Sequence, residues 1–278
     1  MGREAKAFRL QEERRESAAY RRRRGWIIFP GMSGRANDSV DFGFRDVPRE
    51  DKAGLVRGVF DSVAPRYDLM NDLMSLGVHR LWKAALVRAL RPRPGMALLD
   101  VAGGTGDIAA AAAAEGARAV VVDINEDMAA AGRDRALDRG RLDVGWAVAD
   151  AEALPFTDMS QDAVTIAFGL RNVTGRGKAL AEMRRVLKPG GRFFCMEFSH
   201  VEAPALRVLY ERYAFGVLPR LGALVAGDAD AYRYLAESIA RFPDREALAA
   251  SMRAAGFGRV RWSILSGGIV ALHRGWRL

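Results

Sequence analysis

A glycine-rich turn between two acidic residues is the stretch of this sequence whose residue types and spacing first suggest chemistry. The turn consists of Gly103, Gly104, Thr105 and Gly106. An apolar run precedes it, and a run of alanines with high helix propensity follows it. Strand, glycine turn and helix in this order form a ligand crevice at the edge of an open α/β sheet. Glycines let the backbone approach the ligand, and the helix start offers unpaired N–H groups.

The acids that flank the turn, Asp100 and Asp107, bear on the kind of ligand. The spacing Gly104-x-Gly106-x-x-Ala109 satisfies a relaxed dinucleotide fingerprint, so NAD is a candidate. A carboxylate repels a pyrophosphate but attracts a sulfonium or an ammonium group. The turn therefore favours S-adenosyl-L-methionine (SAM). A nicotinamide-dependent oxidoreductase and a structural turn without a ligand remain the alternatives.

Three further apolar runs end in polar residues that suit the same crevice. Asp123 ends the second run, where a carboxylate can accept hydrogen bonds from both ribose hydroxyls. Asp150 and Ala151 follow the third run, in position to bind an adenine amino group and to flank the ring. Arg171 and Asn172 follow the fourth run, where a second substrate would lie. The alternatives are that Asp123 caps a helix, that Asp150 is a solvated loop acid and that Arg171 is a surface arginine.

The elements that must position these residues alternate between strands and helices. Apolar runs predict strands over 96–101, 118–123, 142–149, 162–168 and 192–198. Helices are predicted after the glycine turn, over 125–139 and over 179–187, the last ended by Lys188-Pro189-Gly190-Gly191. This alternation predicts a doubly wound α/β sheet. Strands over 259–265 and 269–276, joined by a Gly267-Gly268 hairpin, complete a mostly parallel seven-stranded sheet.

Two helical segments lie outside this alternation. Residues 49–91 have amphipathic helical spacing, with a helix–loop–helix junction that holds Tyr67, Asn71 and His79. The junction is either a lid over an apolar ligand or an ordinary packing element. Residues 203–240 are rich in large apolar and aromatic residues, Tyr232 among them. They either cap an apolar substrate or pack on the sheet.

Composition narrows the classes of function. The net charge is +9, but residues 1–31 hold nine Arg or Lys and four Glu, so +5 lies there and +4 in the remaining 247 residues. We therefore expect no nucleic-acid partner, although a nucleic-acid methyltransferase is the alternative that the charge suggests. The single cysteine, Cys195, excludes an internal disulfide. The three histidines show no metal-ligand spacing, so no metal is expected, and no apolar run reaches the ~18 residues of a membrane span.

Residues 1–40 are predicted to be a basic N-terminal extension, disordered or a start-site artefact, ahead of a single domain over 41–278. A basic block at Arg21–Arg24 precedes an apolar stretch. We interpret residues 1–31 as the product of an upstream start codon, with Met32 opening the functional protein. A membrane-surface anchor and a transit peptide are the alternatives, the latter disfavoured by four glutamates.

Several stretches resemble the ubiquinone/menaquinone biosynthesis C-methyltransferases. One signature of that family matches Tyr67-Asp68-x-Met70-Asn71-x-x-Met74-Ser75-x-x-x-His79-x-x-Trp82, and a second matches Arg185 to Gly191 through Glu197-x-Ser199. Residues 168–174, 228–235 and 271–275 also match, and the resemblance runs from about Asp41 to Leu278. It implies the class I SAM-dependent methyltransferase fold, Rossmann-like, with an N-terminal helical lid and a helical insertion before the last two strands.

The resemblance also assigns candidate site residues. The methyl-donor contacts of the family fall on Thr105, Asp123, Asp150 and Ala151, beside the three glycines of the turn. Ala167 stands where the family usually has a serine, so any contact there must come from the backbone. The lost hydrogen bond contributes only about 1 kcal/mol. The acceptor contacts implied are Tyr67, Asn71, His79 and Tyr232.

The resemblance implies transfer of a methyl group from SAM to a ring carbon of a polyprenylated benzoquinol, with demethylmenaquinol as the related substrate. Loss of a hydroxyl proton makes that carbon nucleophilic. Arginine has a pKa above about 12 and is a poor proton acceptor, so we expect Arg171 to stabilise the phenolate and Asn172 to orient it. The sequence does not name the base, which is a carboxylate or a water held by one.

A substrate with a long prenyl tail is expected to reside in a membrane, so the enzyme must contact the membrane surface. We expect a bacterial cytoplasmic protein, peripherally associated with the inner membrane through residues 203–240 and 49–91. Other quinone-biosynthesis enzymes and a second copy of the chain are the partners expected. A non-catalytic scaffold of a quinone-synthesis complex is the alternative, against which the intact glycine turn and Asp123 speak.

Overall fold

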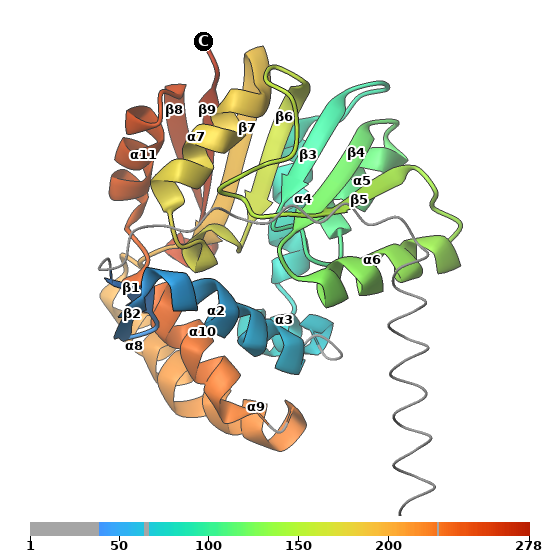
Figure 1. Cartoon of the computed structure of the whole chain (residues 1–278). Helices are drawn as coiled ribbons and strands as arrows, with labels where there is room; N and C mark the ends of the chain where they lie inside the picture. The colour runs from blue at the N-terminus through green and yellow to red at the C-terminus, as the bar shows by residue number, and fades with distance from the viewer. Residues whose placement is uncertain (1–38, 64–66, 227) are drawn as a thin grey trace, which may run out of the picture.

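A seven-stranded sheet is the centre of the protein, whose computed structural model describes residues 39–63, 67–226 and 228–278 (Figure 1). The strand order is β5-β4-β3-β6-β7-β9-β8. The strands are β3 (Ala97–Val101), β4 (Arg118–Asp123), β5 (Val144–Val148), β6 (Gln161–Ala167), β7 (Leu187–Phe198), β8 (Gly258–Leu265) and β9 (Val270–Trp276). Neighbours from β5 to β7 are parallel, and β9 is antiparallel to β7 and β8. The predicted doubly wound, mostly parallel seven-stranded sheet is confirmed.

Strand β3 shows how the sheet separates two hydrophobic layers. Leu98 packs in the layer that holds α4 and α5, whereas Leu99 and Val101 pack in the layer that holds α7 and α11. Successive residues of a strand point to opposite faces, so this apolar run fills both layers. The helices concerned are α4 (His79–Leu90), α5 (Asp107–Ala114), α7 (Arg176–Val186) and α11 (Arg245–Ala254), and α6 (Glu126–Asp138) packs beside β4 and β5.

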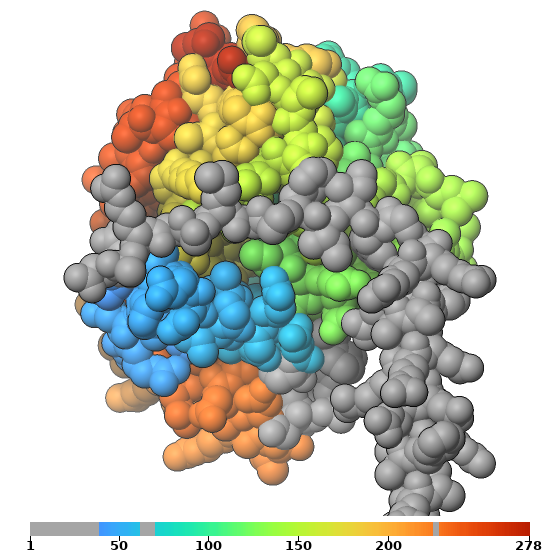
Figure 2. Space-filling model, viewed as in Figure 1, coloured from blue at the N-terminus to red at the C-terminus, as the bar shows by residue number. Residues whose placement is uncertain are grey.

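A helical layer covers the carboxyl ends of the strands (Figure 1). It contains α2 (Arg49–Val63), α3 (Tyr67–Ser75), α8 (Pro204–Glu211), the π-helical segment η3 (Arg212–Val217), α9 (Leu218–Ala226) and α10 (Ala229–Arg241). Tyr213 on η3 donates a hydrogen bond to the carbonyl of Leu73 on α3, and α10 packs against α2. Figure 2 shows α2 on the surface between the sheet and the α8–α10 segment. The helical prediction for 203–240 is confirmed.

A small hairpin at the start of the described chain was not predicted. Strands β1 (Ser39–Phe42) and β2 (Arg45–Pro48) pair with each other, and Asp41 bonds the buried Lys52 at 3.3 Å. The predicted domain boundary after residue 40 falls within β1. The predictions for residues 1–38, including the start at Met32, lie outside the described residues.

Two local predictions are corrected by the fold. Tyr67–Ser75 is a helix, not part of a loop, and the break lies at Leu76 and Gly77, which both have positive φ. Lys188-Pro189-Gly190-Gly191 lies inside β7 and does not separate it from the preceding helix. The reason is tertiary, because Leu187 pairs with Gln161 and the amide of Gly190 donates to the carbonyl of Arg277.

Candidate active site

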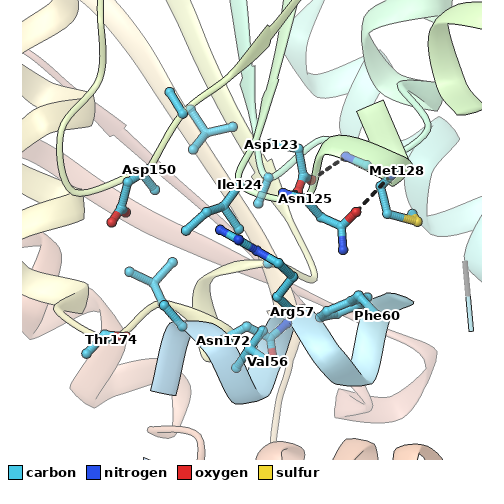
Figure 3. A pocket seen from close by; sticks show the side chains of 18 of the residues that line it. Val56, Arg57, Phe60, Asp123, Ile124, Asn125, Met128, Asp150, Asn172 and Thr174 are labelled. Carbon is cyan, nitrogen blue, oxygen red and sulfur yellow. Dashed lines mark hydrogen bonds between the residues drawn. The ribbon is translucent and has the colours of Figure 1, made fainter. Parts of the chain in front are cut away.

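A cleft lies at the carboxyl ends of the parallel strands, closed on one side by α2 (Figure 3). Its walls from the sheet side include Gly104, Asp123, Ile124, Met128, Asp150, Ala151, Ala167, Asn172 and Thr174. Val56, Arg57 and Phe60 line it from α2. The Arg57 side chain reaches from α2 into the middle of the cleft (Figure 3). The predicted crevice and its helical lid are thus brought together.

The carboxylate of Asp123 is fixed by the backbone on both of its oxygens. Oδ2 accepts a hydrogen bond from the amide of Gly104 and Oδ1 accepts one from the amide of Asn125, both at 2.8 Å. Burial raises the pKa of Asp123, and these amide donors oppose that shift. A carboxylate oxygen has two acceptor sites, so each oxygen can still accept one hydroxyl. The geometry suits the two adjacent hydroxyls of a ribose.

Asp150 lies across the cleft from Asp123, as Figure 3 shows. Its Oδ1 accepts a hydrogen bond from the amide of Glu152 at 2.8 Å, which fixes the turn after β5. Ala151 and Ala167, whose side chains are methyl groups, also line the cleft. A flat apolar ring with an exocyclic amino group fits between these walls, with Asp150 as the acceptor.

A second cavity adjoins the cleft. It is lined by Asn71, His79, Lys83, Asp100, Gly103, Thr105, Asp107 and Ile108, and it shares Ala102, Ala167 and Phe168 with the cleft. Ala102 and Phe168 have φ of +50° and +58°. A residue other than glycine in this conformation costs on the order of 1–3 kcal/mol, and such strain clusters at functional sites. These residues terminate β3 and β6, where the two cavities meet.

Asp100 gives this second cavity a buried acceptor. The side chain is almost fully buried, and Oδ1 accepts a hydrogen bond from the Thr165 hydroxyl at 2.6 Å. Oδ2 has no hydrogen-bond partner among the described residues. Burial raises the pKa of Asp100 to about 7, against the opposing effect of the Thr165 hydrogen bond. A ligand cation beside Oδ2 would satisfy this oxygen and favour its ionised form.

Of the two acids that flank the glycine turn, Asp100 has an oxygen open to a ligand cation, whereas Asp107 is paired within the protein. Asp107 bonds Lys83 at 2.7 Å and Arg135 at 2.9 Å, and these cations lower its pKa against the effect of burial. Its charge is therefore balanced within the protein. Gly106, predicted to bind the donor, lines neither cavity; a Cβ there would lie 2.5 Å from the ring of Trp146. Gly106 is required by packing.

Arg171 does not face the site, which corrects its predicted catalytic role. Residues 170–172 form a short 3-10 turn that directs Asn172 to the cleft and buries Arg171. The Arg171 guanidinium lies 3.3 Å from Glu197 and also donates to the carbonyl of Phe168. Its Nε has no hydrogen-bond partner among the described residues, but Arg171 lines neither of the two cavities, so the predicted contact with a phenolate is not supported.

The residues predicted to contact the acceptor lie in different parts of the structure. Asn71 and His79 are buried and line the second cavity. Tyr67 begins α3, but its side chain lies outside the described residues. Tyr232 is fully buried, lines neither cavity, and packs so closely on Gly222 that a Cβ there would lie 2.3 Å from its ring. Its position is that of a core residue, so the predicted substrate contact is not supported.

Several residues of the site were not singled out from the sequence. Arg57 comes from a helix whose apolar face alone was interpreted, and Ile124 follows the strand-end acid. Lys83 and Tyr234 become part of the site only through tertiary contacts with Asp107 and Asn172. Ile124 could have been predicted, because it directly follows Asp123 at the end of a strand. Nothing in the sequence pointed to Arg57, Lys83 or Tyr234.

The fold and the cleft together define the class of protein. Solved structures with the same fold include a SAM-dependent methyltransferase from Thermotoga maritima, 22% identical with a TM-score of 0.57, which covers 80% of this chain and 100% of that one. A SAM-dependent methyltransferase from Aquifex aeolicus is 16% identical with a TM-score of 0.53, over 70% of this chain and 89% of that one. The protein has the fold of a class I SAM-dependent methyltransferase, and the orphaned Asp100 oxygen, the Asp123 cradle and the Asp150 wall fit that donor.

Sequence comparisons identify the family. The family model described as "ubiE/COQ5 methyltransferase family" matches residues 45–277, and the chain belongs to this family. A ubiquinone/menaquinone biosynthesis C-methyltransferase from Acidiphilium cryptum is 58% identical over 249 residues, covering 89% of this chain and 100% of the relative. One from Paracoccus denitrificans is 57% identical over 240 residues, covering 85% and 96%. The protein is a methyltransferase.

Proposed function

We propose that this protein is a C-methyltransferase of quinone biosynthesis. The methyl group comes from SAM, and the acceptor is a ring carbon of a polyprenyl-methoxy-benzoquinol, of demethylmenaquinol, or of both. The observation that carries the proposal is the 58% identity to a relative of that name over the relative's whole length, together with a donor cleft built as described.

This chain's own residues would hold the donor from three sides. Asp123 would accept hydrogen bonds from the ribose hydroxyls, Asp150 would accept one from the adenine amino group, and Asp100 would lie beside the ammonium group. When bound, SAM supplies an electrophilic methyl group on a sulfonium. Holding the reactants in line at near-attack distance supplies roughly 7–11 kcal/mol of the barrier in well-oriented reactions. Asn172, with its amide at the cleft wall, is the candidate for orienting the acceptor.

A separate apolar cavity is the candidate site for the prenyl tail. It has a volume of about 290 Å³ and lies among α3, α8, η3, α9 and α10. Its lining includes Met74, Ser199, Tyr210, Tyr213, Leu218 and Ile239. Helix α3 contributes Met74 to this cavity and Asn71 to the donor-side cavity. A ring bound near α3 can therefore direct its tail between α8 and α10.

The outer surface of α8, η3 and α9 suits the face of a bilayer. Large apolar side chains are exposed at Val208, Leu209, Phe215, Val217 and Leu224. Arginines are interspersed at positions 207, 212 and 220. Exposed apolar residues with nearby arginines favour an anionic membrane surface. Among the described residues, no helix is both long and apolar enough to span a membrane. We propose peripheral contact with the cytoplasmic face of a bacterial inner membrane.

A vesicle-binding experiment tests this contact. The wild-type chain is expected to cosediment with anionic phospholipid vesicles, and Leu209→Glu with Leu224→Glu is expected to weaken binding at least tenfold. Leu137→Glu with Leu142→Glu is the matched control, because these leucines are exposed on another face. Equal loss in both pairs, or no binding by the wild type, would contradict the proposal.

Complementation tests the activity itself. A bacterial strain that lacks its quinone C-methyltransferase accumulates the demethylated quinones. Expression of this chain is expected to restore the methylated quinones, and Asp123→Asn is expected not to. Quinone profiling by mass spectrometry also decides which acceptors are used. An unchanged quinone profile despite soluble expression would contradict the proposed function.

A further inference from the structure

His79 lies in the cavity that adjoins the donor cleft. It begins α4, is only 3% exposed, and faces the same cavity as Asn71 and Asp100. That cavity meets the donor cleft at Ala102, Ala167 and Phe168. The donor's ribose and adenine are assigned to the other cavity, so its reactive end must extend toward this junction. His79 therefore lies in the cavity that Asp100 assigns to the ammonium end of the donor, close to the junction at which the methyl group would meet the acceptor.

The hydrogen bonds around Ser75 determine which nitrogen of His79 carries the proton. The Ser75 Oγ lies 2.7 Å from the carbonyl of Asn71, which can only accept, so the single hydroxyl proton is donated there. Oγ also accepts a hydrogen bond from the amide of His79 at 3.1 Å. Its contact with Nδ1 at 3.0 Å must then be a donation from Nδ1–H to Oγ. In the neutral ring this leaves the lone pair on Nε2.

Nε2 is free to accept a proton from a ligand. Among the residues that the structure describes, His79 makes hydrogen bonds through its amide and through Nδ1, and none through Nε2. Nδ1 is held by Ser75, so the ring cannot turn without losing that hydrogen bond. A neutral histidine with a fixed tautomer and an open Nε2 is the arrangement that general-base catalysis requires.

The charges that face the His79 ring come from α3, α4 and α5. Asp72 Oδ1 lies 3.6 Å from Nδ1, while Arg80, Lys83 and Asp107 lie further along the same network. Burial lowers the pKa of His79, Lys83 adds to this, and Asp72 opposes it. The ring is therefore neutral at pH 7. Asp72 is in position to stabilise the imidazolium that forms when Nε2 takes a proton, as a carboxylate does in a catalytic triad.

We infer that His79 is the general base of this enzyme and that its Nε2 takes the proton from the hydroxyl of the quinol acceptor. This inference rests on the proposed function. The O–H electron pair stays on the oxygen and is shared with the ring, whose carbon forms the new bond to the methyl group as the carbon–sulfur bond breaks. The ring carbon then loses its hydrogen as a proton to water, and the imidazolium returns its proton to the oxygen. One proton is released per methyl group transferred.

Other candidate bases are less suited to this step. Asp107 is paired with Lys83 and Arg135, and Arg171 is a cation paired with Glu197. Asp100 Oδ2 is inside the glycine turn, so close to Gly103 that a Cβ there would lie 2.9 Å away. That position faces the donor. Among these groups, only His79 offers an unoccupied lone pair away from the turn.

The test compares His79→Asn with Ser75→Ala. Asparagine keeps a donor near the position of Nδ1 but has no group at Nε2. With saturating donor and a short-chain 2-methoxy-6-prenyl-benzoquinol, kcat is expected to fall about 10²- to 10⁴-fold. The acidic limb of the kcat–pH profile is expected to disappear in His79→Asn but to persist in Asp100→Asn, which removes the other titrating group of this cavity. The Kd of His79→Asn for S-adenosylhomocysteine is expected to change less than threefold. Ser75→Ala leaves the base but frees its tautomer, so kcat is expected to fall about tenfold with the acidic limb retained.

Two further measurements keep the test decisive. An acceptor with a more acidic hydroxyl is expected to bring the rate of His79→Asn back toward wild type, because less help from a base is needed. Arg88→Gln, an exposed change on the same helix, is the control and is expected to retain activity. Unchanged kcat in a folded His79→Asn variant, or a loss carried entirely by donor affinity, overturns the inference. If His79→Asn does not fold, loss of the acidic limb in Ser75→Ala overturns it. A wild type that does not methylate the quinol overturns the proposed function instead.

Discussion

The hydroxyl of Tyr234 on α10 lies 3.0 Å from Oδ1 of Asn172 at the exit of β6. Because the phenol donates to Oδ1, the amide nitrogen of Asn172 is the group directed elsewhere, and Asn172 lines the donor cleft. The Tyr234 ring stacks on Phe42 of β1 with centroids 4.4 Å apart. The N-terminal hairpin thus supports the residue that fixes an amide at the active site.

Loss of this hydrogen bond is expected to affect catalysis more than folding. Tyr234→Phe keeps the stack on Phe42 but lets the Asn172 amide rotate, so kcat/KM is expected to fall about tenfold, the equivalent of one net hydrogen bond. Steady-state kinetics of Tyr234→Phe, Asn172→Ala and the double variant provide the check. In the Asn172→Ala background, Tyr234→Phe is expected to have no further effect, and additive losses would contradict the coupling.

Replacing Asp123 is expected to reduce donor affinity. In Asp123→Asn the carboxamide cannot accept from both Gly104 and Asn125 through two oxygens, and the charge-assisted bonds to ribose are lost. A hydrogen bond to a charged group contributes about 1.5–3 kcal/mol, so the Kd for S-adenosylhomocysteine should rise about 10- to 100-fold. Calorimetry measures this value. Asp138→Asn, an exposed change of the same charge on α6, is expected to leave the Kd unchanged.

Two glycines with the same backbone conformation should respond differently to alanine. Gly95 has φ +77° with open space around it, whereas Gly106 has φ +76° and lies against Trp146. Gly95→Ala is expected to lower the free energy of unfolding by about 1 kcal/mol through backbone strain alone. Gly106→Ala adds overpacking and should be about 1–3 kcal/mol worse. Urea unfolding of both variants measures the difference between their free energies of unfolding. Equal losses would mean that the Trp146 ring moves aside at no cost.

The raised pKa of Asp100 predicts a pH dependence of stability. Its pKa is about 7 in the folded chain against 3.8 ordinarily, because burial disfavours the charged form. Between these values the folded state binds more protons than the unfolded state, so the free energy of unfolding falls as pH rises from about 4 to 7. Asp100→Asn keeps the hydrogen-bond acceptor for Thr165 and removes the contribution of Asp100 to the pH dependence of the free energy of unfolding.

The measurement is urea unfolding of both proteins across that range, without ligand. Relative to Asp100→Asn, the wild type should lose up to about 4 kcal/mol between pH 4 and 7 and nothing further above pH 8. A constant difference between the two proteins would contradict a raised pKa at Asp100.

The sheet was predictable because its signals are local. Apolar runs and the glycine turn located all seven strands, and the acids that follow β4 and β5 were correctly expected at one crevice. The hairpin β1–β2 escaped because its strands are four residues long and carry mixed polar residues. The helical nature of Tyr67–Ser75 escaped because polar residues between methionines fit a loop and a helix equally well.

The sequence by itself determined the fold class and brought the polar residues at the strand ends to one cleft, since the strand ends of a parallel sheet necessarily meet at one edge. It could not determine the charge state or direction of side chains that depend on distant partners. Only the tertiary structure paired Arg171 with Glu197 and balanced the charge of Asp107 with Lys83 and Arg135. Only the tertiary structure placed His79, held by Ser75, in the cavity beside Asp100. An ionic or hydrogen-bonded pair is fixed by three-dimensional proximity, and residue spacing along the chain does not encode it.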